Sequence, residues 1–513
     1  MKLQTPRAGR NRVRPDALVV FCLAGEDGRP DLATLPKNVH DAVARNAPAK
    51  IGAEGTSCTI PLGGDGAAKR LYVIGAGKEA EISPRKARGI LRSTLKGVAK
   101  NGETSAEIDF PFKLQRMDAA ESRDFLLRNL ALADYSFKTY KSDEKEKPSL
   151  ASAWFSADRG PWKGIDGRVA AKETAAATTV VAAAELVREL GNTPACDMTP
   201  RLFAERIELE AAKRKLPITV LDREAIAAER MGGLLAVSRG SAEEPRLVVL
   251  EHRGGKKDDP PVALVGKGVT FDAGGISIKP AEKMGEMKWD MMGAATVVGA
   301  VLAAADLKLP VNLVALAPLT ENLPSGSAYK PGDIVRFRNG KTAEIDNTDA
   351  EGRVILADAL DYAKKWKPRA IFDFATLTGA ALVALGVEAA VVFTSDDGLS
   401  RELVSAGERT DERLWRLPLW DDYKENIKSD WADFKNTGGR WGGSINGAMF
   451  LKEFVDPKTP WAHLDIAPTA NYEQEFAGYG PGATAFGLSL TLRWLKDRLE
   501  GRKRGRRPAR RRA

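Results

Sequence analysis

The chain has 513 residues, of which 43% are hydrophobic and 29% are charged, and its formal net charge is +9. This length and apolar content predict a globular protein of two domains. Three histidines and three cysteines exclude a His-rich zinc site of the HExxH type and a disulfide framework.

The first 165 residues predict a smaller N-terminal α/β domain. Ala17–Ala24 and Arg70–Gly75 are apolar runs typical of buried strands. Helical patterns follow at Ser83–Lys100 and Ala119–Leu132. Ser83 suits the N-cap of the first helix, and the proline after it suits the first helical position.

The apolar run at 17–24 follows several basic residues, so a signal peptide is the alternative to a strand. The run has only eight residues, and Gly25-Glu26-Asp27 does not resemble a small-residue cleavage site. A strand is therefore favoured. No other apolar run approaches the roughly 20 residues that span a bilayer. The sequence thus predicts no membrane partner, and the few scattered cysteines fit a reducing cytoplasm.

A larger C-terminal domain is expected at residues 191–500, preceded by an Ala-rich helix within residues 166–190. In this larger domain short apolar runs alternate with helical patterns. Such alternation predicts an α/β fold with a mixed, mainly parallel sheet flanked by helices. The runs and patterns are Val262–Gly266, Ala294–Ala305, Val311–Leu319, Val354–Trp366, Ala370–Ala375 and Ala389–Thr394.

A first polar cluster follows the strand predicted at 262–266. Lys267 comes directly after it, Asp272 precedes two glycines, and Lys279 and Asp290 lie downstream. The glycines permit positive φ or close backbone approach. Taken singly, Lys267 could be a solvated loop lysine, Lys279 a lysine at a strand end and Asp290 a helix N-cap.

A second polar cluster is the heptapeptide Asn347-Thr348-Asp349-Ala350-Glu351-Gly352-Arg353, which precedes a helical pattern. In an extended segment Asp349 and Glu351 would project to the same side. Two such carboxylates repel unless they share a proton or bind a cation. A strand-to-helix junction is where open α/β sheets usually hold ligands. For this heptapeptide alone, a surface turn before an amphipathic helix is the alternative.

Together the clusters supply four carboxylates, two lysines and an arginine on loops that follow apolar strands. Four carboxylates in one pocket are typical of a site for two divalent cations, because little else offsets so much buried negative charge. Paired metal ions roughly 3.5–4 Å apart are a common hydrolytic device.

These clusters resemble the signatures of the leucyl aminopeptidase family, dinuclear metallo-exopeptidases also called cytosol aminopeptidases. The heptapeptide matches the family's signature, and residues 267–290 carry its second motif. Further matches occur at 373–379, 437–440 and 461–467, so the resemblance covers roughly residues 170–498. It implies that residues 191–500 are a catalytic domain and that 166–190 form a linking helix.

The resemblance implies a role for each clustered residue. Asp272 and Glu351 are expected to bridge the metals, Lys267 and Asp290 to complete one site, and Asp349 to complete the other. Lys267 must be neutral to coordinate, so its pKa must be strongly lowered by adjacent dications and burial. The oxygen-rich ligands suit Mn²⁺ or Mg²⁺, and zinc also tolerates them.

The same resemblance supplies the catalytic groups and partners. Lys279 is expected to stabilise the oxyanion of the tetrahedral intermediate, and Arg353 to position a bicarbonate ion that accepts a proton from the attacking water. One metal is expected to bind the free α-amine of a peptide substrate, which restricts cleavage to N-termini. The family further implies a homohexamer built as two trimers.

Substrate-binding residues are implied in the same way. Met287, Thr376, Gly379 and Ala467 are expected to line the pocket for the N-terminal side chain, and the apolar methionine favours bulky residues such as leucine. Met287 could equally fill the core. Backbone hydrogen bonds to the substrate are implied for Asn347, Leu377 and Gly379.

Three other positions affect the interpretation. Trp441 and Cys196 depart from residues common in the family, which leaves the breadth of substrate choice open. His463 lies in an apolar, strand-like run, and we expect it to be a packed, hydrogen-bonded histidine rather than a metal ligand.

Residues 501–513 are predicted to be a disordered basic tail. Eight positive charges lie in it, which leaves +1 for the rest of the chain. The tail is either a solvated end or an arm for nucleic acid or another acidic surface. Beside the favoured aminopeptidase, two alternatives remain: a nucleic-acid-binding or structural protein with secondary peptidase activity, and a dinuclear hydrolase of another amide.

Overall fold

The computed structural model describes residues 1–5, 14–25, 29–32, 35, 37–62, 68–142 and 150–505. The chain forms two compact units. Unit 1 comprises Met1–Ala182 and Gln474–Pro481, and unit 2 comprises Ala183–Glu473 and Gly482–Ala513. The boundary falls within helix α4 (Gly167–Asn192), the helix expected at 166–190.

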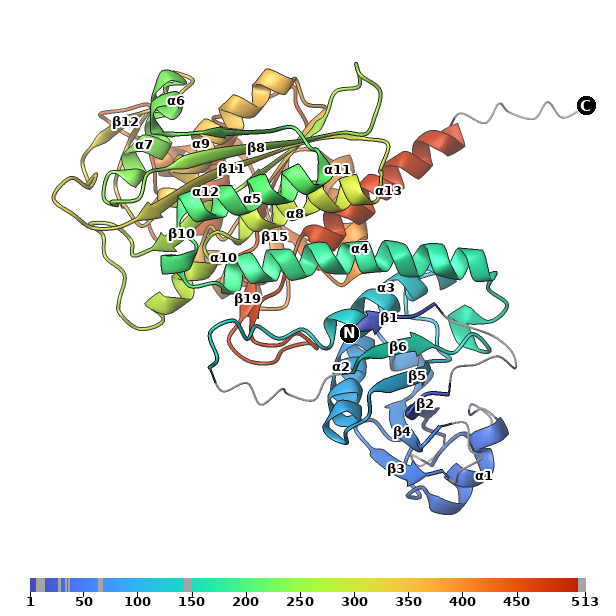
Figure 1. Ribbon diagram of the computed structural model, residues 1–513. Helices are drawn as coiled ribbons and strands as arrows, with labels where there is room; N and C mark the ends of the chain where they lie inside the picture. The colour runs from blue at the N-terminus through green and yellow to red at the C-terminus, as the bar shows by residue number, and fades with distance from the viewer. Residues whose placement is uncertain are drawn as a thin grey trace, which may run out of the picture. The chain divides into compact units, whose positions relative to one another are not determined.

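Unit 1 is built on a sheet of order β1-β6-β5-β2-β4-β3, parallel except where β3 pairs with β4 (Figure 1). Its strands are β1 (Lys2–Leu3), β2 (Ala17–Leu23), β3 (Ser57–Pro61), β4 (Arg70–Gly77), β5 (Ser105–Asp109) and β6 (Ser152–Phe155). Its helices include α1 (Lys37–Asn46), α2 (Pro84–Lys100) and α3 (Ala119–Leu132). Ser83 caps α2 as expected, accepting a hydrogen bond from the Lys86 backbone N–H.

Strand β2 shows how the core of unit 1 is divided. Ala17, Val19 and Phe21 pack into a cluster with residues of α2 and α3. Leu18 and Val20 pack into a second cluster with residues of α1. Because side chains alternate along a strand, both faces of this parallel sheet are buried, as its uninterrupted apolar sequence requires.

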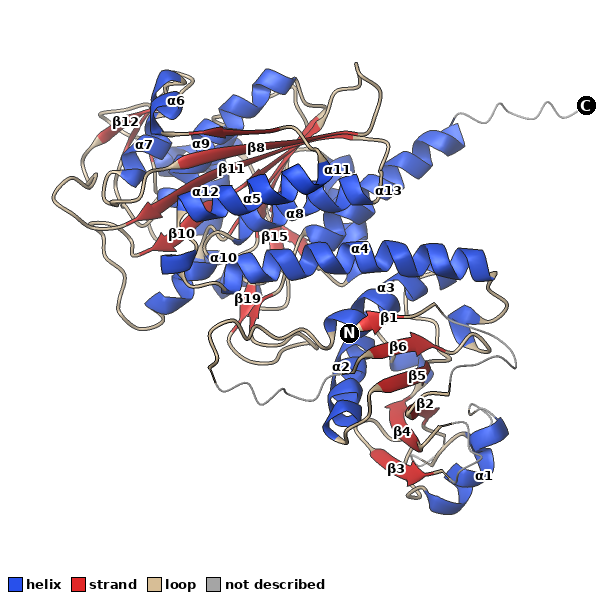
Figure 2. Ribbon diagram, in the orientation of Figure 1, coloured by secondary structure: helices blue, strands red, loops and turns tan. Residues whose placement is uncertain are grey.

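Unit 2 carries the larger sheet, whose order is β16-β15-β18-β14-β9-β11-β8-β7, with β10 also paired to β11 (Figure 2). The pairs β9–β11, β9–β14, β14–β18, β10–β11 and β15–β16 are parallel, and β7–β8, β8–β11 and β15–β18 are antiparallel. The mixed, mainly parallel sheet predicted from the sequence is thus confirmed. The strands are β7 (Ile218–Leu221), β8 (Arg246–Arg253), β9 (Val262–Gly266), β10 (Gly268–Asp272), β11 (Asn312–Asn322), β14 (Ala370–Ala375), β15 (Ala390–Phe393), β16 (Leu414–Arg416) and β18 (Trp461–Asp465).

Helices cover both faces of this sheet (Figure 2). Ala263 and Val265 of β9 pack with residues of α7 and α9, while α8 packs against β8, β9, β11 and β14. The helices are α5 (Pro200–Arg214), α6 (Arg223–Ala228), α7 (Gly232–Ser238), α8 (Met292–Asp306), α9 (Glu351–Ala363), α10 (Gly379–Leu385), α11 (Asp397–Thr410), α12 (Gly443–Lys452) and α13 (Leu488–Gly505). In a smaller three-stranded sheet, β13 (Thr342–Glu344) pairs with β12 (Ile334–Arg336) and β17 (Phe434–Lys435), and in a two-stranded sheet β19 (Asn471–Tyr472) pairs with β20 (Gly482–Ala483).

One helix needs comment and one expectation from the sequence needs correction. Among the described residues one stretch, Met284–Asp306, is long and apolar enough to cross a membrane by length and composition. In its most apolar window 83% of the residues are buried, so packing of α8 against the sheet accounts for its composition. The predicted tail begins too early, because α13 continues to Gly505, and lysine and arginine are good helix formers. Residues 506–513 lie outside the described residues.

Candidate metal centre

Lys267 lies between β9 and β10, where its backbone is fixed on both sides. Its N–H donates to Phe374 O at 2.9 Å, and its carbonyl accepts from Ala294 N at 2.8 Å. The ammonium lies 2.8 Å from Asp290 Oδ1 and 2.7 Å from Glu351 Oε1. It also donates to Thr376 O at 2.9 Å. The side chain is buried, so this cation is held by contacts inside the protein.

Asp272 ends β10, and its strand register places it opposite Asn322 of β11. Its Oδ1 accepts hydrogen bonds from Asn322 Nδ2 and from the Gly274 backbone N–H, both at 2.8 Å. Gly274 and Gly275 have φ of +87° and +67°, the positive values that the sequence suggested. The turn that they form brings Lys279 back, and its Nζ lies 2.9 Å from Asp272 Oδ2.

The heptapeptide is a turn followed by a helix, so the extended arrangement considered from the sequence is wrong. The Asn347 side-chain oxygen accepts from the Asp349 N–H at 2.8 Å, and its carbonyl accepts from Ala350 N at 3.2 Å. An asparagine that bonds to the backbone two residues on stabilises such a turn. Glu351 is the first residue of α9, so the cluster does lie at the junction before a helix. Asp349 Oδ1 pairs closely with Lys279.

Asp290 follows a short 3₁₀ helix, Met284–Trp289, and is not the N-cap of α8. Its Oδ1 accepts a hydrogen bond from Thr376 Oγ1 at 2.7 Å. Its Oδ2 is buried and has no hydrogen-bond partner. Ligand atoms of Asp290, Asp272 and Glu351 all lie within 4.8 Å of one another. The structure therefore brings three buried carboxylates together from the end of β10, the start of α9 and the segment between the 3₁₀ helix and α8.

Burial and mutual repulsion disturb the ionisation of this cluster. Burial raises the pKa of Asp290 well above its ordinary value, and the neighbouring Glu351 carboxylate raises it further. Burial also raises the pKa of Asp272 and of Asp349. A cation placed among these groups would reverse that trend by favouring their charged forms.

The two lysines have pKa values opposite to the expectation for a coordinating amine. Burial by itself would lower the pKa of Lys267, but the Asp290 and Glu351 carboxylates raise it above its ordinary value. Burial also acts to lower the pKa of Lys279, but the Asp272 carboxylate raises it, and the net effect is a pKa above the ordinary value. The lowered pKa expected for Lys267 required the charge of two dications beside the amine, and carboxylates alone act in the other direction.

The residues present fit a divalent metal centre. Asp290 Oδ2 is buried without a partner, and Glu351 Oε1 has no hydrogen bond although it lies 2.7 Å from the Lys267 ammonium. Buried carboxylate oxygens without donors are rare unless an ion is bound to them. The oxygen-rich donor set suits Mn²⁺ or Mg²⁺, and Zn²⁺ also accepts carboxylate oxygen.

Arg353 extends from the first turn of α9 and is buried. Its Nη1 donates to Asn436 O at 2.7 Å, and its Nε has no hydrogen-bond partner. Burial lowers the pKa of Arg353 to about 10, although the carboxylates of Glu351 and Asp465 oppose that effect. The guanidinium is therefore a buried cation with donor capacity left over, which is suited to holding a small anion.

The residues expected to bind substrate lie on neighbouring loops. Thr376 contacts Asp290 and Lys267 as described, and Asn347 forms the turn before Asp349. Backbone N–H groups of Leu377 and Ala467 both donate to Asp465 Oδ1, at 3.1 and 3.3 Å.

The other two positions are placed less closely by contacts. Gly379 is exposed and begins α10, immediately after this loop. Met287 is half-buried in the 3₁₀ helix, and its carbonyl accepts from Asp290 N at 3.3 Å. Met287 is therefore close in sequence to Asp290, a member of the carboxylate cluster.

Several supporting residues were not assigned a role from the sequence. Asn322 bonds both Asp272 and Thr348 O, the latter at 3.0 Å, and the Tyr329 hydroxyl donates to the same Thr348 carbonyl at 2.8 Å. Asn436 Nδ2 donates to Asn347 O at 2.7 Å. The sequence signals for these supporting roles were indirect. Asn436 stands next to the Thr437-Gly438-Gly439 motif, and Asn322 ends a strand.

His463 is buried in β18, and its Nδ1 lies 2.5 Å from Asp373 Oδ1. The ring also stacks on Phe393, with the centroids 5.8 Å apart. The expectation of a packed, hydrogen-bonded histidine is confirmed.

Comparison with known proteins places the chain in a well-populated group. Residues 185–492 match the cytosol aminopeptidase family, catalytic domain, and residues 35–144 match the N-terminal domain of the same family. A probable cytosol aminopeptidase of Syntrophotalea carbinolica is 43% identical over 490 residues, covering 94% of this chain and 97% of that protein. Another, of Geobacter sulfurreducens, is 45% identical over 430 residues, covering 84% of this chain and 85% of that protein.

Solved structures give the same result. A tomato leucine aminopeptidase variant has a TM-score of 0.82 at 31% identity and covers 96% of each chain. The bottromycin maturation enzyme BotP in complex with Mn has a TM-score of 0.81 at 33% identity, covering 94% of this chain and 99% of that one.

Proposed function

This chain belongs to the cytosol aminopeptidase family and is a metal-dependent aminopeptidase, a hydrolase, and we propose that it releases bulky hydrophobic N-terminal residues such as leucine from peptides. The observation that carries the proposal is the meeting of Asp272, Asp290 and Glu351 within 4.8 Å, beside the buried Lys267 and the half-buried Lys279.

We assign two divalent ions, Mn²⁺ or Zn²⁺ and alternatively Mg²⁺, to this cluster. Asp272 and Glu351 would contact both ions, Lys267 and Asp290 one of them, and Asp349 the other. When bound, such a pair lowers the pKa of a water molecule and polarises the scissile carbonyl. The requirement for a free α-amine follows if that amine completes the coordination of one ion.

The chain's own cations would act on the charge that develops during the reaction. Lys279, held between Asp272 and Asp349, stays charged and would donate to the oxyanion as it forms. Arg353 would hold an anion at its unsatisfied Nε, and bicarbonate, as proton acceptor for the attacking water, fits that role. The buried position of Arg353 strengthens its attraction for an anion because water does not screen it.

Substrate selection is assigned to the loops around the cluster. Met287, Thr376, Gly379 and Ala467 would line the space for the N-terminal side chain, and Asn347, Leu377 and Gly379 would bond the substrate backbone. The half-buried, flexible methionine favours large apolar side chains over charged ones.

The proposal is tested by hydrolysis of Leu-p-nitroanilide with added Mn²⁺ or Zn²⁺, next to the N-acetylated compound and to Asp-p-nitroanilide. We expect turnover of the free leucyl compound, at least tenfold slower turnover of the aspartyl compound and none of the acetylated one. Absence of activity on the free amine would contradict the peptidase assignment, and equal turnover of the blocked amine would contradict the role of the amine.

Two further properties follow from family membership and are also proposals. We infer a homohexamer of two trimers from the family resemblance alone, and a cytoplasmic location from the name of the relatives and from three cysteines that form no disulfide. Six chains of 55.4 kDa would give a particle of about 330 kDa, which light scattering after gel filtration measures directly.

A further inference from the structure

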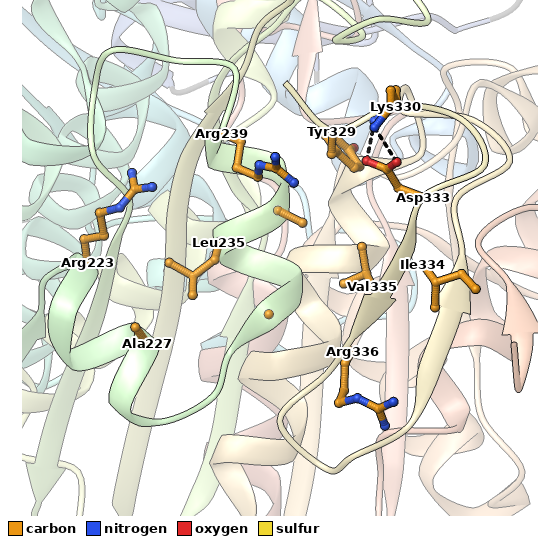
Figure 3. A pocket seen from close by; sticks show the side chains of 12 residues that line it. Arg223, Ala227, Leu235, Arg239, Tyr329, Lys330, Asp333, Ile334, Val335 and Arg336 are labelled. Atoms are coloured by element: carbon orange, nitrogen blue, oxygen red, sulfur yellow. Dashed lines mark hydrogen bonds and ion pairs between the residues drawn. The ribbon is translucent and has the colours of Figure 1, made fainter. Parts of the chain in front are cut away.

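A cavity of about 570 Å³ lies in unit 2, and none of the clustered carboxylates lines it (Figure 3). One wall is formed by α6 and α7, and the other by the segment 329–336, which includes β12. We call it the basic pocket. Its lining residues are Arg223, Ala227, Gly232, Leu235, Ala236, Arg239, Tyr329, Lys330, Asp333, Ile334, Val335 and Arg336.

The charges of the basic pocket are strongly unbalanced. Three arginines and a lysine face a single carboxylate, Asp333, whose Oδ1 is paired with Lys330 at 2.6 Å. Within the described part of the chain no ion pair joins Arg223, Arg239 or Arg336 to a carboxylate; Arg336 Nη1 donates to Gly340 O at 3.0 Å. Figure 3 shows Arg223 and Arg239 on the helical wall and Arg336 on the other. The lining of this hollow therefore carries a surplus of three positive charges, all on exposed side chains.

Part of the lining between the arginines is apolar. Leu235 and Ala236 of α7 and Ile334 and Val335 of β12 supply it, and Ile334 is 51% exposed. Cavities of roughly 300–1,000 Å³ with an apolar lining and a few placed polar groups are typical of small-molecule sites. The occupant that matches both features has an apolar body and more than one negative charge.

We propose that the basic pocket binds an organic phosphate of about the size of a nucleoside monophosphate. A phosphate monoester carries about two negative charges near neutral pH, so it offsets more of the surplus than one carboxylate does. Guanidinium groups match phosphate oxygens with paired hydrogen bonds. The organic body lies against Leu235, Ile334 and Val335.

The wall of the basic pocket is bonded directly to the turn that carries Asp349. Gly332 N donates to Ile345 O at 2.7 Å, and Ile345 N donates to Asp333 O at 2.9 Å. The Tyr329 hydroxyl donates to Thr348 O at 2.8 Å. An occupant that fixes the segment 329–336 also fixes this turn, so occupancy alters peptidase activity. This coupling, unlike the binding itself, rests on the proposed function.

Titration calorimetry of the metal-loaded enzyme with AMP tests the site, with adenosine and inorganic phosphate as the separated halves of the ligand. We expect AMP to bind, inorganic phosphate to bind at least tenfold more weakly, and adenosine not to bind. The double variant Arg239→Gln, Arg336→Gln should weaken AMP binding at least tenfold. Arg401→Gln, at an exposed position of α11, is the matched control and should leave AMP binding unchanged.

Asp349→Asn separates this site from anion binding at the metal centre. If AMP occupies the basic pocket, this variant keeps its affinity within twofold. Loss of binding in Asp349→Asn together with full binding in the double arginine variant would overturn the proposal, as would equal affinity for AMP and inorganic phosphate. Saturating AMP should change kcat/KM for Leu-p-nitroanilide at least twofold in the wild type and not in the double variant; no change in the wild type overturns the coupling.

Discussion

Gly352 leaves no room for a side chain beside Lys267. A Cβ at this position would lie 2.6 to 2.7 Å from Lys267 Cε, Cδ and Nζ. Glycine costs a helix roughly 0.5–1 kcal/mol relative to alanine, and Gly352 stands in the first turn of α9. Glycine at position 352 weakens α9, but it lets the Lys267 amine pass next to the helix backbone.

Gly352→Ala should therefore remove activity although it favours the helix. On the proposed assignment of Lys267 as a metal ligand, we expect at least a hundredfold lower kcat/KM and fewer than two bound ions per chain by elemental analysis, because the displaced amine would no longer hold an ion. Gly97→Ala in α2 is the matched control, since nothing lies within 4 Å of its added Cβ. The control should gain up to about 1 kcal/mol of unfolding free energy and keep full activity. Normal metal content in Gly352→Ala would contradict the argument.

Lys279 is the cation best placed to act on the reaction rather than on metal binding. Removal of one donor to an oxyanion typically lowers kcat by about 10²–10³-fold. Lys279→Ala should lose activity on that scale while it keeps its metal, because Asp272 and Asp349 remain. Lys283→Ala, which removes only an exposed ion pair with Glu473, should behave as wild type. Loss of bound metal in Lys279→Ala would make the lysine a structural counter-ion instead.

At the scale of residues, local sequence patterns predict the members of the carboxylate and lysine cluster but not the residues that hydrogen-bond to them. Lys267, Asp272, Asp290 and Glu351 stand in two short segments of unusual composition, and the structure brings them together. Asn322 and Tyr329 are ordinary polar residues in their own surroundings. Strand register places Asn322 opposite Asp272, and both Asn322 and Tyr329 donate to Thr348 O. Local sequence patterns encode neither of these long-range contacts.

At the scale of elements, Asp358 joins three pieces of unit 2. It lies on α9, fully buried, and its Oδ2 accepts from Gly233 N and Leu234 N of α7 at 2.7 and 3.1 Å. Its Oδ1 accepts from Arg338 N, in the turn after β12, at 2.8 Å. One carboxylate thus ties the helix that begins with Glu351 to α7, which forms part of one wall of the basic pocket, and to the turn that follows β12 of the other wall.

This tie predicts a pH-dependent stability. Burial raises the pKa of Asp358 to about 7, although the three N–H groups oppose the shift. An unfolded aspartate has a pKa of about 3.9, so the folded state holds the proton more tightly between about pH 4 and 7. By linkage, the contribution of Asp358 to the free energy of unfolding falls as pH rises through that window.

Denaturant unfolding of wild type and Asp358→Asn between pH 5 and pH 8 measures this contribution. The neutral amide does not titrate, so the difference between the two proteins should move in favour of the variant as pH rises. Asp361→Asn, one turn away on α9 and ion-paired with Arg338, is the control. A difference between wild type and Asp358→Asn that does not vary with pH would show that the buried carboxyl keeps an ordinary pKa.

Long elements follow from local sequence, and short ones do not. The strand at 262–266 and the helix at 119–132 were expected at their observed bounds, because an apolar run and a helical period each persist over their length. Helices α6 and α7 and strand β12 are too short to show a period. Packing against α9 and the sheet determines where these elements form. The basic pocket that they line could therefore not be predicted from the sequence.

At the scale of the whole molecule, chain order and compact units do not coincide. Residues 474–481 belong to unit 1, although residues on both sides of them belong to unit 2. Within unit 1 they are held by Arg88, whose Nε donates to Ala477 O at 2.6 Å, and by Lys96, paired with Glu475. Domain boundaries predicted from composition divide the chain into continuous segments, so they cannot assign residues 474–481 to unit 1. No local sequence signal distinguishes these residues from a loop of unit 2.

Charge is also distributed unevenly over the whole molecule. The net charge is +9, and removal of residues 501–513 would leave +1, because eight basic residues lie there. Attraction to a polyanion therefore depends on this end of the chain. We propose that the tail contacts nucleic acid without sequence preference, through release of counterions from phosphates.

A variant that ends at Glu500 tests this role by electrophoretic mobility shift on duplex DNA. We expect the full chain to shift DNA at low salt, with a dependence of log K on log salt no steeper than about −7 for eight phosphate contacts. The shortened chain should fail to shift it and should hydrolyse Leu-p-nitroanilide at the wild-type rate, since the metal cluster lies within 267–353. Equal binding of DNA by both chains would show that the DNA-binding surface lies on the folded units and not on the tail. The near-neutral net charge of the folded units makes such binding unfavourable at physiological salt.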